Sequence, residues 1–386
     1  MTAMIPRLAL LALIASVCGC TGDRDAGPGR SGQQEDDVVE TEQGAWNAST
    51  AWTVGAEPTL EIGSETPGYQ FAGIRGAVRL SDGRISVGDA GSSEVRLYDP
   101  EGKLISKIGR AGGGPEEFRS LGKLVRAAGD SVVVFDAASR RVSVLDRDGR
   151  VARTFTPHAA TAGARLAGVL DNGSFVFGVP LALPPRAGLS RDTIAYLLVS
   201  PDGSVADTLG IAPGGQQFQQ ANGNHVARLS LPFGPTAAAI AGGERIVFGA
   251  TDRYELHEYG PDGSATRILR RKVVPQPFTN AHDRQATEGF PPQIAARLAE
   301  VPRPAQVPVF ASMLMDGQNN LWVKDHPSPQ AVSVAWTVFD HRGSMLGQVQ
   351  LPVNLRITDI GDDYVLGVWP DDLGVERVRM YPLRKP

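Results

Sequence analysis

Cysteine is almost absent from this chain, and its absence excludes several ways of stabilising or using the fold. Only two cysteines occur among the 386 residues, Cys18 and Cys20. A mature chain that begins at Cys20 has no second thiol, so it can form no internal disulfide and has no free thiol nucleophile. The fold therefore depends on core packing and strand topology alone.

An excess of positive charge is also missing. The formal net charge at pH 7 is −4, from 38 basic and 42 acidic side chains. Residues 21–50 hold seven of the acids against two arginines, so the rest of the chain is close to neutral. Without a basic surface, neither nucleic acid nor an anionic lipid surface is an expected partner.

Local motifs of catalysis are missing as well. The run Gly109–Gly114 is rich in glycine, but Pro115 follows where a dinucleotide-binding helix would begin. Neither a His-Glu-x-x-His zinc motif nor a Gly-x-Ser-x-Gly nucleophile motif occurs. We therefore expect no cofactor, no metal ligand set and no catalytic residue from local sequence patterns.

The N-terminus carries an apolar run, Leu8–Val17, preceded by Arg7. Ten residues are too few to span a bilayer as a helix, and the pattern is that of a signal peptide. Val17, Gly19 and Cys20 resemble the lipobox of bacterial lipoproteins. The resemblance implies that residues 1–19 are removed and that Cys20 is lipidated. A plain secretory signal is the alternative interpretation.

The residue after Cys20 bears on location. Thr21 is not the Asp that favours retention at the inner membrane, so the resemblance implies a lipid anchor in the outer membrane of the cell envelope. Residues 20–50 are rich in Gly, Ser, Gln and acids and poor in large apolar side chains. Such a composition cannot bury enough surface to offset its ordering entropy, so it predicts a flexible acidic tether.

The rest of the chain repeats one pattern of short alternating strands and tight turns. Residues 76–108 predict four antiparallel strands, separated by turns such as Ser81–Gly83 and Asp99–Gly102, in which Asp and Gly supply the turn conformations. The same order recurs five more times, and the last copy lacks a strand. We predict an all-β fold over residues 51–386, a six-bladed β-propeller of four-stranded antiparallel blades. A β-sandwich is the alternative.

An unassigned N-terminal strand would complete the incomplete last repeat. Thr59–Gly63 has the pattern of an outer strand, and its expected partner is Val375–Tyr381. This pairing would close the ring and remove two free sheet edges.

One segment resembles a known family. Ile108–Phe118, with the sequence IGRAGGGPEEF, is similar to the Gly-Arg-x-Gly-x-Gly-Pro-x-Glu-Phe segment of bacterial six-bladed, NHL-like β-propeller lipoproteins. The resemblance extends from about Trp52 to Arg384 and implies the same architecture. It implies no particular activity, and no catalytic residue of a propeller enzyme can be carried over to this sequence.

The connections between the predicted strands are unequal on the two faces of the propeller. Turns between first and second strands, and between third and fourth strands, are all short. The connections on the opposite face include three long ones, 178–192, 210–227 and 270–309, and the last contains an insertion, 279–302, with one short helix at Pro292–Glu300. Because long loops in a compact fold usually carry function, we expect the working surface on this face.

Polar side chains on this face are the candidate ligand-binding residues. The amides suit hydrogen bonding to glycan hydroxyls or an extended peptide, and the other members add charge or imidazole groups. The candidates are Arg110, Arg186, Gln216, Gln217, Asn224, His225, His282, Asp283 and His326. We expect a lipid-anchored scaffold that binds a protein, peptide or glycan. A propeller hydrolase or lyase with a metal at the central channel is the alternative, as is the simpler possibility that the loops only cover the hydrophobic rim.

Overall fold

The computed structural model describes residues 37–63, 70–159, 162–181, 187–222 and 225–386. The predicted signal peptide, Cys20, Arg186 and Asn224 lie outside these residues. The described part is predominantly β-strand in a propeller arrangement, so the predicted all-β class and β-propeller fold are confirmed. No helix in the described ranges is long and apolar enough to cross a membrane.

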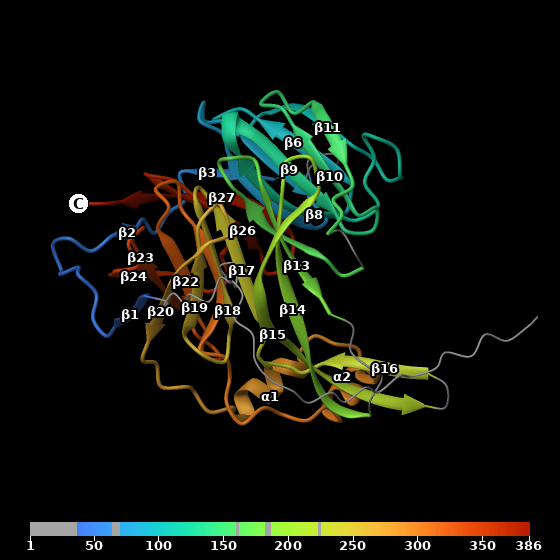
Figure 1. Cartoon of the computed structure of the whole chain (residues 1–386), viewed down its shortest axis with the longest axis vertical. Coiled ribbons are helices and arrows are strands. Elements are labelled where there is room, and N and C mark those ends of the chain that lie inside the picture. The colour runs from blue at the N-terminus through green and yellow to red at the C-terminus, as the bar shows by residue number, and fades with distance from the viewer. Residues whose placement is uncertain (1–36, 64–69, 160–161, 182–186, 223–224) are drawn as a thin grey trace, which may run out of the picture. The chain divides into compact units, whose positions relative to one another are not determined.

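Three of the sheets in the described residues are antiparallel and four-stranded, and their members follow one another along the chain (Figure 1). The first contains β4 (Ile74–Arg79), β5 (Ile85–Asp89), β6 (Glu94–Tyr98) and β7 (Leu104–Ile108). The second contains β8 (Leu121–Ala127), β9 (Ser131–Asp136), β10 (Arg141–Leu145) and β11 (Val151–Phe155), with a 3₁₀ turn at Ala128–Asp130. A later one contains β21 (Phe310–Met315), β22 (Leu321–Asp325), β23 (Ser333–Phe339) and β24 (Met345–Pro352).

A ten-stranded sheet consists of two meanders joined at their first strands and of β1 (Asp37–Thr41), which pairs with the last strand of the second meander. The first meander contains β12 (Arg165–Val169), β13 (Phe175–Pro180), β14 (Gly188–Val199), β15 (Val205–Asn222) and β16 (His225–Ser230). The second contains β17 (Ala237–Gly242), β18 (Arg245–Ala250), β19 (Glu255–Tyr259) and β20 (Ala265–Arg271). One parallel pair, Gly168 with Ala241, joins them. A Cβ on Gly168 would collide with the Ala241 carbonyl oxygen, so only glycine permits this backbone approach.

The last sheet combines both ends of the described chain. It contains β25 (Arg356–Ile360), β26 (Tyr364–Pro370) and β27 (Glu376–Arg384), together with β2 (Thr53–Val54) and β3 (Leu60–Ile62). The antiparallel pairing of β3 with β27 places Leu60 opposite Met380 and Ile62 opposite Val378. The N-terminal strand therefore pairs with the strand that was expected from the sequence.

Residues 37–50 do not form a free tether, so this part of the sequence prediction is wrong. Strand β1 (Asp37–Thr41) pairs in parallel with β20. Further along, the backbone N–H groups of Ala45 and Trp46 donate to carbonyl oxygens of β24 at 3.1 and 2.7 Å. This segment lies along the outer strands of successive sheets because those strands still offer unpaired backbone groups.

Two of the three predicted long loops are largely strand, which corrects the loop assignment. Strands β14 and β15 continue past their sheet, and β16 pairs back on β15 (Figure 1). The third connection contains two helices, α1 (Asn280–Thr287) and α2 (Pro292–Ala299), where the sequence predicted only the second. Helix α1 is polar and shows no apolar periodicity, and it begins at a capping box formed by Thr279 and His282.

The core lies between neighbouring sheets. Ile85 and Val87 of the first sheet pack with Leu366 and Val368 of the last, and all four side chains are buried. The tight turns opposite the long connections have the expected chemistry, because their glycines adopt positive φ angles. These glycines are Gly83, Gly102, Gly149, Gly173, Gly203, Gly263 and Gly343.

Candidate functional site

The face that carries the long connections has two prominent parts. We call the projecting ends of β14 and β15, residues 188–191 and 213–222, together with β16, the strand extension. We call residues 272–309 the helical insertion. The amide of Gln220 in the strand extension donates to a carboxylate oxygen of Glu300 in the helical insertion at 3.1 Å, so the two parts are in contact.

Amide side chains of the strand extension are engaged within it. The Gln217 amide donates to Asp192 Oδ2 at 3.4 Å, and the Gln219 amide donates to Ser190 Oγ at 3.0 Å. Gln219 is buried. The half-buried Gln216 pairs with Arg191 across the two strands. The candidate glutamines thus form part of the internal structure of the extension, because a sheet face with few apolar side chains is held together by polar ones.

The outer edge of the extension is β16, which begins at the candidate residue His225. His225 pairs with Asn222 at the end of the ladder. In the part of the chain that the structure describes, β16 is the last strand of its sheet. Its outward backbone groups are therefore not used by another strand, which is the arrangement that an added peptide strand requires.

Two candidate histidines come together around Phe233. The centroid of the Phe233 ring lies 5.2 Å from that of His282 and 5.8 Å from that of His326, and Phe278 lies 5.4 Å from His282. His282 is only 2% exposed, and its Nδ1 accepts from the Thr279 N–H at 3.1 Å. Burial lowers the pKa of both histidines, which favours neutral rings in this aromatic cluster. The cluster attaches helix α1 to the propeller.

The remaining candidates have local roles. Asp283 forms an ion pair with Arg303 inside the helical insertion. Arg110 lies in the connection between β7 and β8, where its guanidinium contacts Glu117 at 2.8 Å. Glu117 also accepts from the Gly114 N–H at 2.8 Å, so the pair braces the glycine-rich loop. The structure brings His282, Asp283 and His326 into one region and leaves Arg110 in a separate loop.

Sequence reasoning missed the apolar side chains that this face exposes. Seven large hydrophobic residues with at least 41% of their surface exposed occur in its described connections and strand ends, whereas only Ile105 and Val205 lie at described strand ends beside the tight turns of the opposite face. The seven are Leu181, Leu189, Val274, Phe290, Ile294, Val332 and Leu373. Their signal in the sequence is an apolar residue inside an otherwise polar connection.

A concavity also occurs on this face. A pocket of about 570 Å³ lies between helix α1 and the β22–β23 connection. Ala281, Arg284 and Gln285 line one side, and Pro329 and Gln330 line the other. The lining of this pocket is mostly polar and charged.

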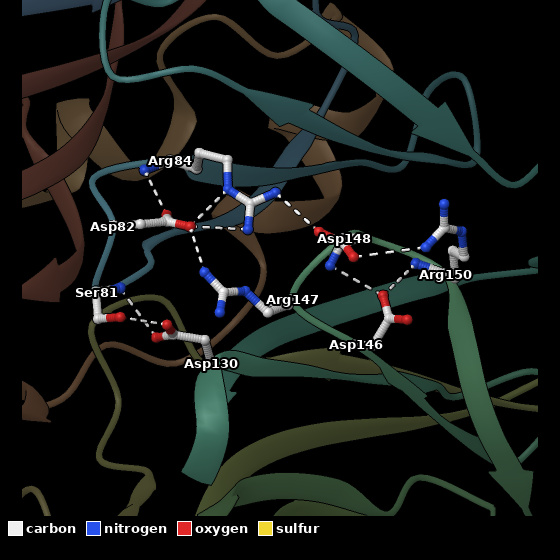
Figure 2. A network of polar contacts seen from close by, with 8 residues as sticks. All are labelled: Ser81, Asp82, Arg84, Asp130, Asp146, Arg147, Asp148 and Arg150. Carbon is white, nitrogen blue, oxygen red and sulfur yellow. Dashed lines mark hydrogen bonds and ion pairs between the residues drawn. The ribbon is translucent and has the colours of Figure 1, made fainter.

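The opposite face is occupied by ion pairs that join neighbouring sheets (Figure 2). Arg84 lies beside the β4–β5 turn and contacts Asp82 at 2.8 Å and Asp148, in the β10–β11 turn, at 3.3 Å. Arg147 contacts Asp82 at 3.0 Å. The hydrogen bond from Arg84 lowers the pKa of Asp82 below its usual value. Because these charged groups pair with one another, they are less available to a partner.

The central channel is a third surface. A cavity of about 220 Å³ is lined by the first strands of the sheets, β4, β8, β12, β17, β21 and β25, and by the turns that follow them. Asp316 accepts from the Trp322 indole N–H at 3.0 Å, and Asp359 accepts from the Tyr364 hydroxyl at 2.7 Å. Across the described ranges, no three His, Cys, Asp or Glu side chains are grouped so that they could hold a metal ion.

The fold and these surfaces define a β-propeller protein. No protein-family model matches the chain, and no curated protein matches it in sequence. A solved structure described as an exported protein from Bacteroides fragilis is 11% identical, covers 90% of this chain and 99% of its own, and has a TM-score of 0.51. A member of the duf4221 family from Bacteroides vulgatus is 12% identical over 87% of this chain and 99% of its own, with a TM-score of 0.48. At such identities the likeness concerns the fold alone.

Proposed function

We propose that this protein is a lipid-anchored scaffold of the cell envelope that binds a protein or peptide through the long-connection face of a closed, six-bladed propeller. The observation that carries this proposal is the concentration of exposed large apolar side chains on that face. A glycan partner is less well matched, because the candidate amide of Gln217 is already hydrogen-bonded to Asp192.

The sheet pairings support six blades. The ten-stranded sheet divides at the single Gly168–Ala241 pair into two meanders of the same strand order as the others. The first strands then contact one another in the order β4, β8, β12, β17, β21, β25 and back to β4. Strands β2 and β3 pair with β27 at the outer position of the last sheet, which supports closure of the ring by the N-terminal segment.

An envelope location is supported by two independent features. The N-terminal signal with Cys20 resembles that of a lipoprotein, and the solved structure with the similar fold from Bacteroides fragilis is described as exported. A lipid anchor would hold the propeller close to a membrane surface, where partners are also confined. Attachment to the outer membrane follows from Thr21 and remains part of the proposal.

The choice of a polypeptide partner follows from the chemistry of the exposed groups. Val274, Val332 and Leu373 are 86–88% exposed, so their side chains are almost fully hydrated in the isolated protein. Burial of each against a partner removes apolar surface from water, which is worth about 1.5–3 kcal/mol for a side chain of this size. The unpaired edge of β16 adds backbone donors and acceptors that an extended peptide can satisfy.

Replacing exposed apolar residues of this face is expected to reduce partner capture without loss of stability. The variant carries Leu189→Ser, Phe290→Ser and Ile294→Ser, whose side chains are 51%, 52% and 41% exposed. The control is Ile105→Ser, which is 50% exposed on β7 of another blade. Quantitative affinity capture from envelope extract should recover at least about tenfold less partner with the triple variant than with the control.

Two results would contradict the assignment of the face. One is equal capture by the triple variant and the wild type. The other is loss of capture when the β6–β7 turn, Asp99–Gly102, is replaced by Gly-Ser residues, since that turn lies on the tight-turn face.

Substitution of Cys20 is expected to release the protein from the membrane. In Cys20→Ala the thiol that would carry the lipid is missing. Fractionation of cells should move the variant from the membrane to the soluble fraction. Cys18→Ala is the matched control and should remain in the membrane fraction. Unchanged membrane association of Cys20→Ala would refute lipidation at this residue.

A further inference from the structure

The central channel contains a lysine in unusual surroundings. The cavity of about 220 Å³ has both polar and apolar walls, and the apolar residues that line it include Val78, Val125, Val169 and Ile240. Lys123 of β8 also lines this cavity. Mouth residues such as Asp171 and Gly317 are exposed, so the cavity opens to solvent on the tight-turn face.

A β-bulge accounts for the direction of Lys123. The register of β8 against β9 shifts between Leu121 and Leu124, which leaves Gly122 and Lys123 without opposite residues in the ladder. A bulge turns a side chain away from the alternation that the rest of the strand obeys. Leu121 is buried, whereas Lys123 lines the channel.

Arg126, Asp316 and Asp359 of the channel already have polar partners. Arg126 donates to the Arg79 carbonyl oxygen at 3.2 Å. Burial lowers the pKa of Arg126, but nearby groups, above all the carboxylate of Asp359, raise it above its usual value. Asp359 accepts from the Arg79 N–H at 2.9 Å as well as from Tyr364. Asp316 accepts from Asn320 and Trp322, and Lys385 lies 3.9 Å from it.

Lys123 differs from these groups because it has no counter-charge in the described structure. Its ammonium donates to the Ala167 carbonyl oxygen at 3.1 Å, and no carboxylate of the described residues lies within ion-pair distance. An ammonium has three N–H donors, so two remain for another acceptor. Desolvation lowers the pKa of Lys123 to about 8, and no nearby acid offsets that effect.

We propose that the central channel binds a small organic monocarboxylate whose carboxylate group pairs with the Lys123 ammonium. A carboxylate supplies both the missing charge and the missing acceptors, while the apolar side chains among the lining residues contact a short hydrocarbon portion. Phosphate fits less well, because Asp171, Asp316 and Asp359 also line the cavity and would repel a dianion more strongly than a monoanion. This site lies apart from the long-connection face and does not depend on the function proposed for that face.

Calorimetric titration with propionate tests the proposal. Propionate is expected to bind to the wild type, whereas its uncharged isostere propionamide is not. Lys123→Met should weaken propionate binding by at least about tenfold, since it removes the charge and keeps the apolar stem. Lys107→Met is the matched control. Lys107 lies on the outer strand β7, its side chain is 59% exposed, and it pairs with Glu94. The control should bind propionate as the wild type does.

The pH dependence supplies a second measurement that needs no variant. A carboxylate binds the protonated amine, so affinity should be constant well below the Lys123 pKa of about 8 and fall as the pH rises through it. An ordinary surface lysine would lose affinity only near pH 10. The proposal is wrong if neither propionate nor butyrate binds, if propionamide binds equally well, or if Lys123→Met retains wild-type affinity. Preferential binding of inorganic phosphate would also overturn it.

Discussion

Removal of residues 37–63 is expected to lower the melting temperature by roughly 10 °C or more. The deletion takes away β1, β2 and β3 and exposes the outer edge of β27. It also removes Trp46 and Trp52, whose rings lie 4.8 Å apart, and Trp52 lies 5.9 Å from the buried Trp322. Ile62 of β3 is 3% exposed, so the deletion also removes its packing in the core.

The size of this effect follows from the burial of apolar groups. Each large apolar side chain that returns to water costs about 1.5–3 kcal/mol, so several together exceed about 5 kcal/mol. Thermal unfolding followed by tryptophan fluorescence measures the change. A deletion of residues 21–35 serves as the control and should leave the melting temperature unchanged. If the two deletions unfold at the same temperature, the N-terminal segment does not complete the propeller.

Substitution of Arg245 by Met is expected to destabilise the protein by about 3–5 kcal/mol. The Arg245 guanidinium forms two parallel hydrogen bonds with Glu258, both of 2.9 Å, and the two side chains are only 8% and 3% exposed. Arg245 also donates to the carbonyl oxygens of Asn319 and Asp340 in the next sheet. The variant leaves the Glu258 carboxylate buried with only Arg267, 3.7 Å away, as a cation.

A double variant separates the two causes of this loss. Arg245→Met combined with Glu258→Leu removes both charges, so it should be more stable than Arg245→Met alone. Chemical denaturation of the two variants and the wild type measures the difference. Arg270→Met is a suitable control, because the Arg270 side chain is 44% exposed and its ion pair with Glu255 lies on the surface. If Arg245→Met is as stable as Arg270→Met, the buried pair of Arg245 and Glu258 contributes nothing to the free energy of unfolding.

Local chemistry made the repeated sheets predictable. Strand alternation and Asp-Gly turns act between residues close in sequence, so segments such as Ile85–Asp89 and Glu94–Tyr98 could be assigned without knowledge of their neighbours. The outer strand Leu60–Ile62 was predictable for a similar reason. The last repeat is one strand short, and this N-terminal strand belongs to no other repeat.

Elements that depend on distant partners were not predictable in the same way. The segment Pro213–Asn222 is rich in Gly and Gln and has little β-propensity, yet it is strand because β14 and β16 pair with it on both sides. Strand β1 lies in an acidic segment and exists because β20 offers a free edge. Helix α1 is held by the contact of His282 with Phe233, which is 49 residues earlier in the chain.

The sequence by itself determined the strand order, the turn positions and the difference between the two faces, because these follow from interactions over a few residues. Only the tertiary structure decided which groups meet. Lys123 is an ordinary lysine in the sequence, and its missing counter-charge becomes visible only when strands from the whole chain surround it. The environment of a side chain in a propeller channel depends on every blade, so no local pattern can specify it.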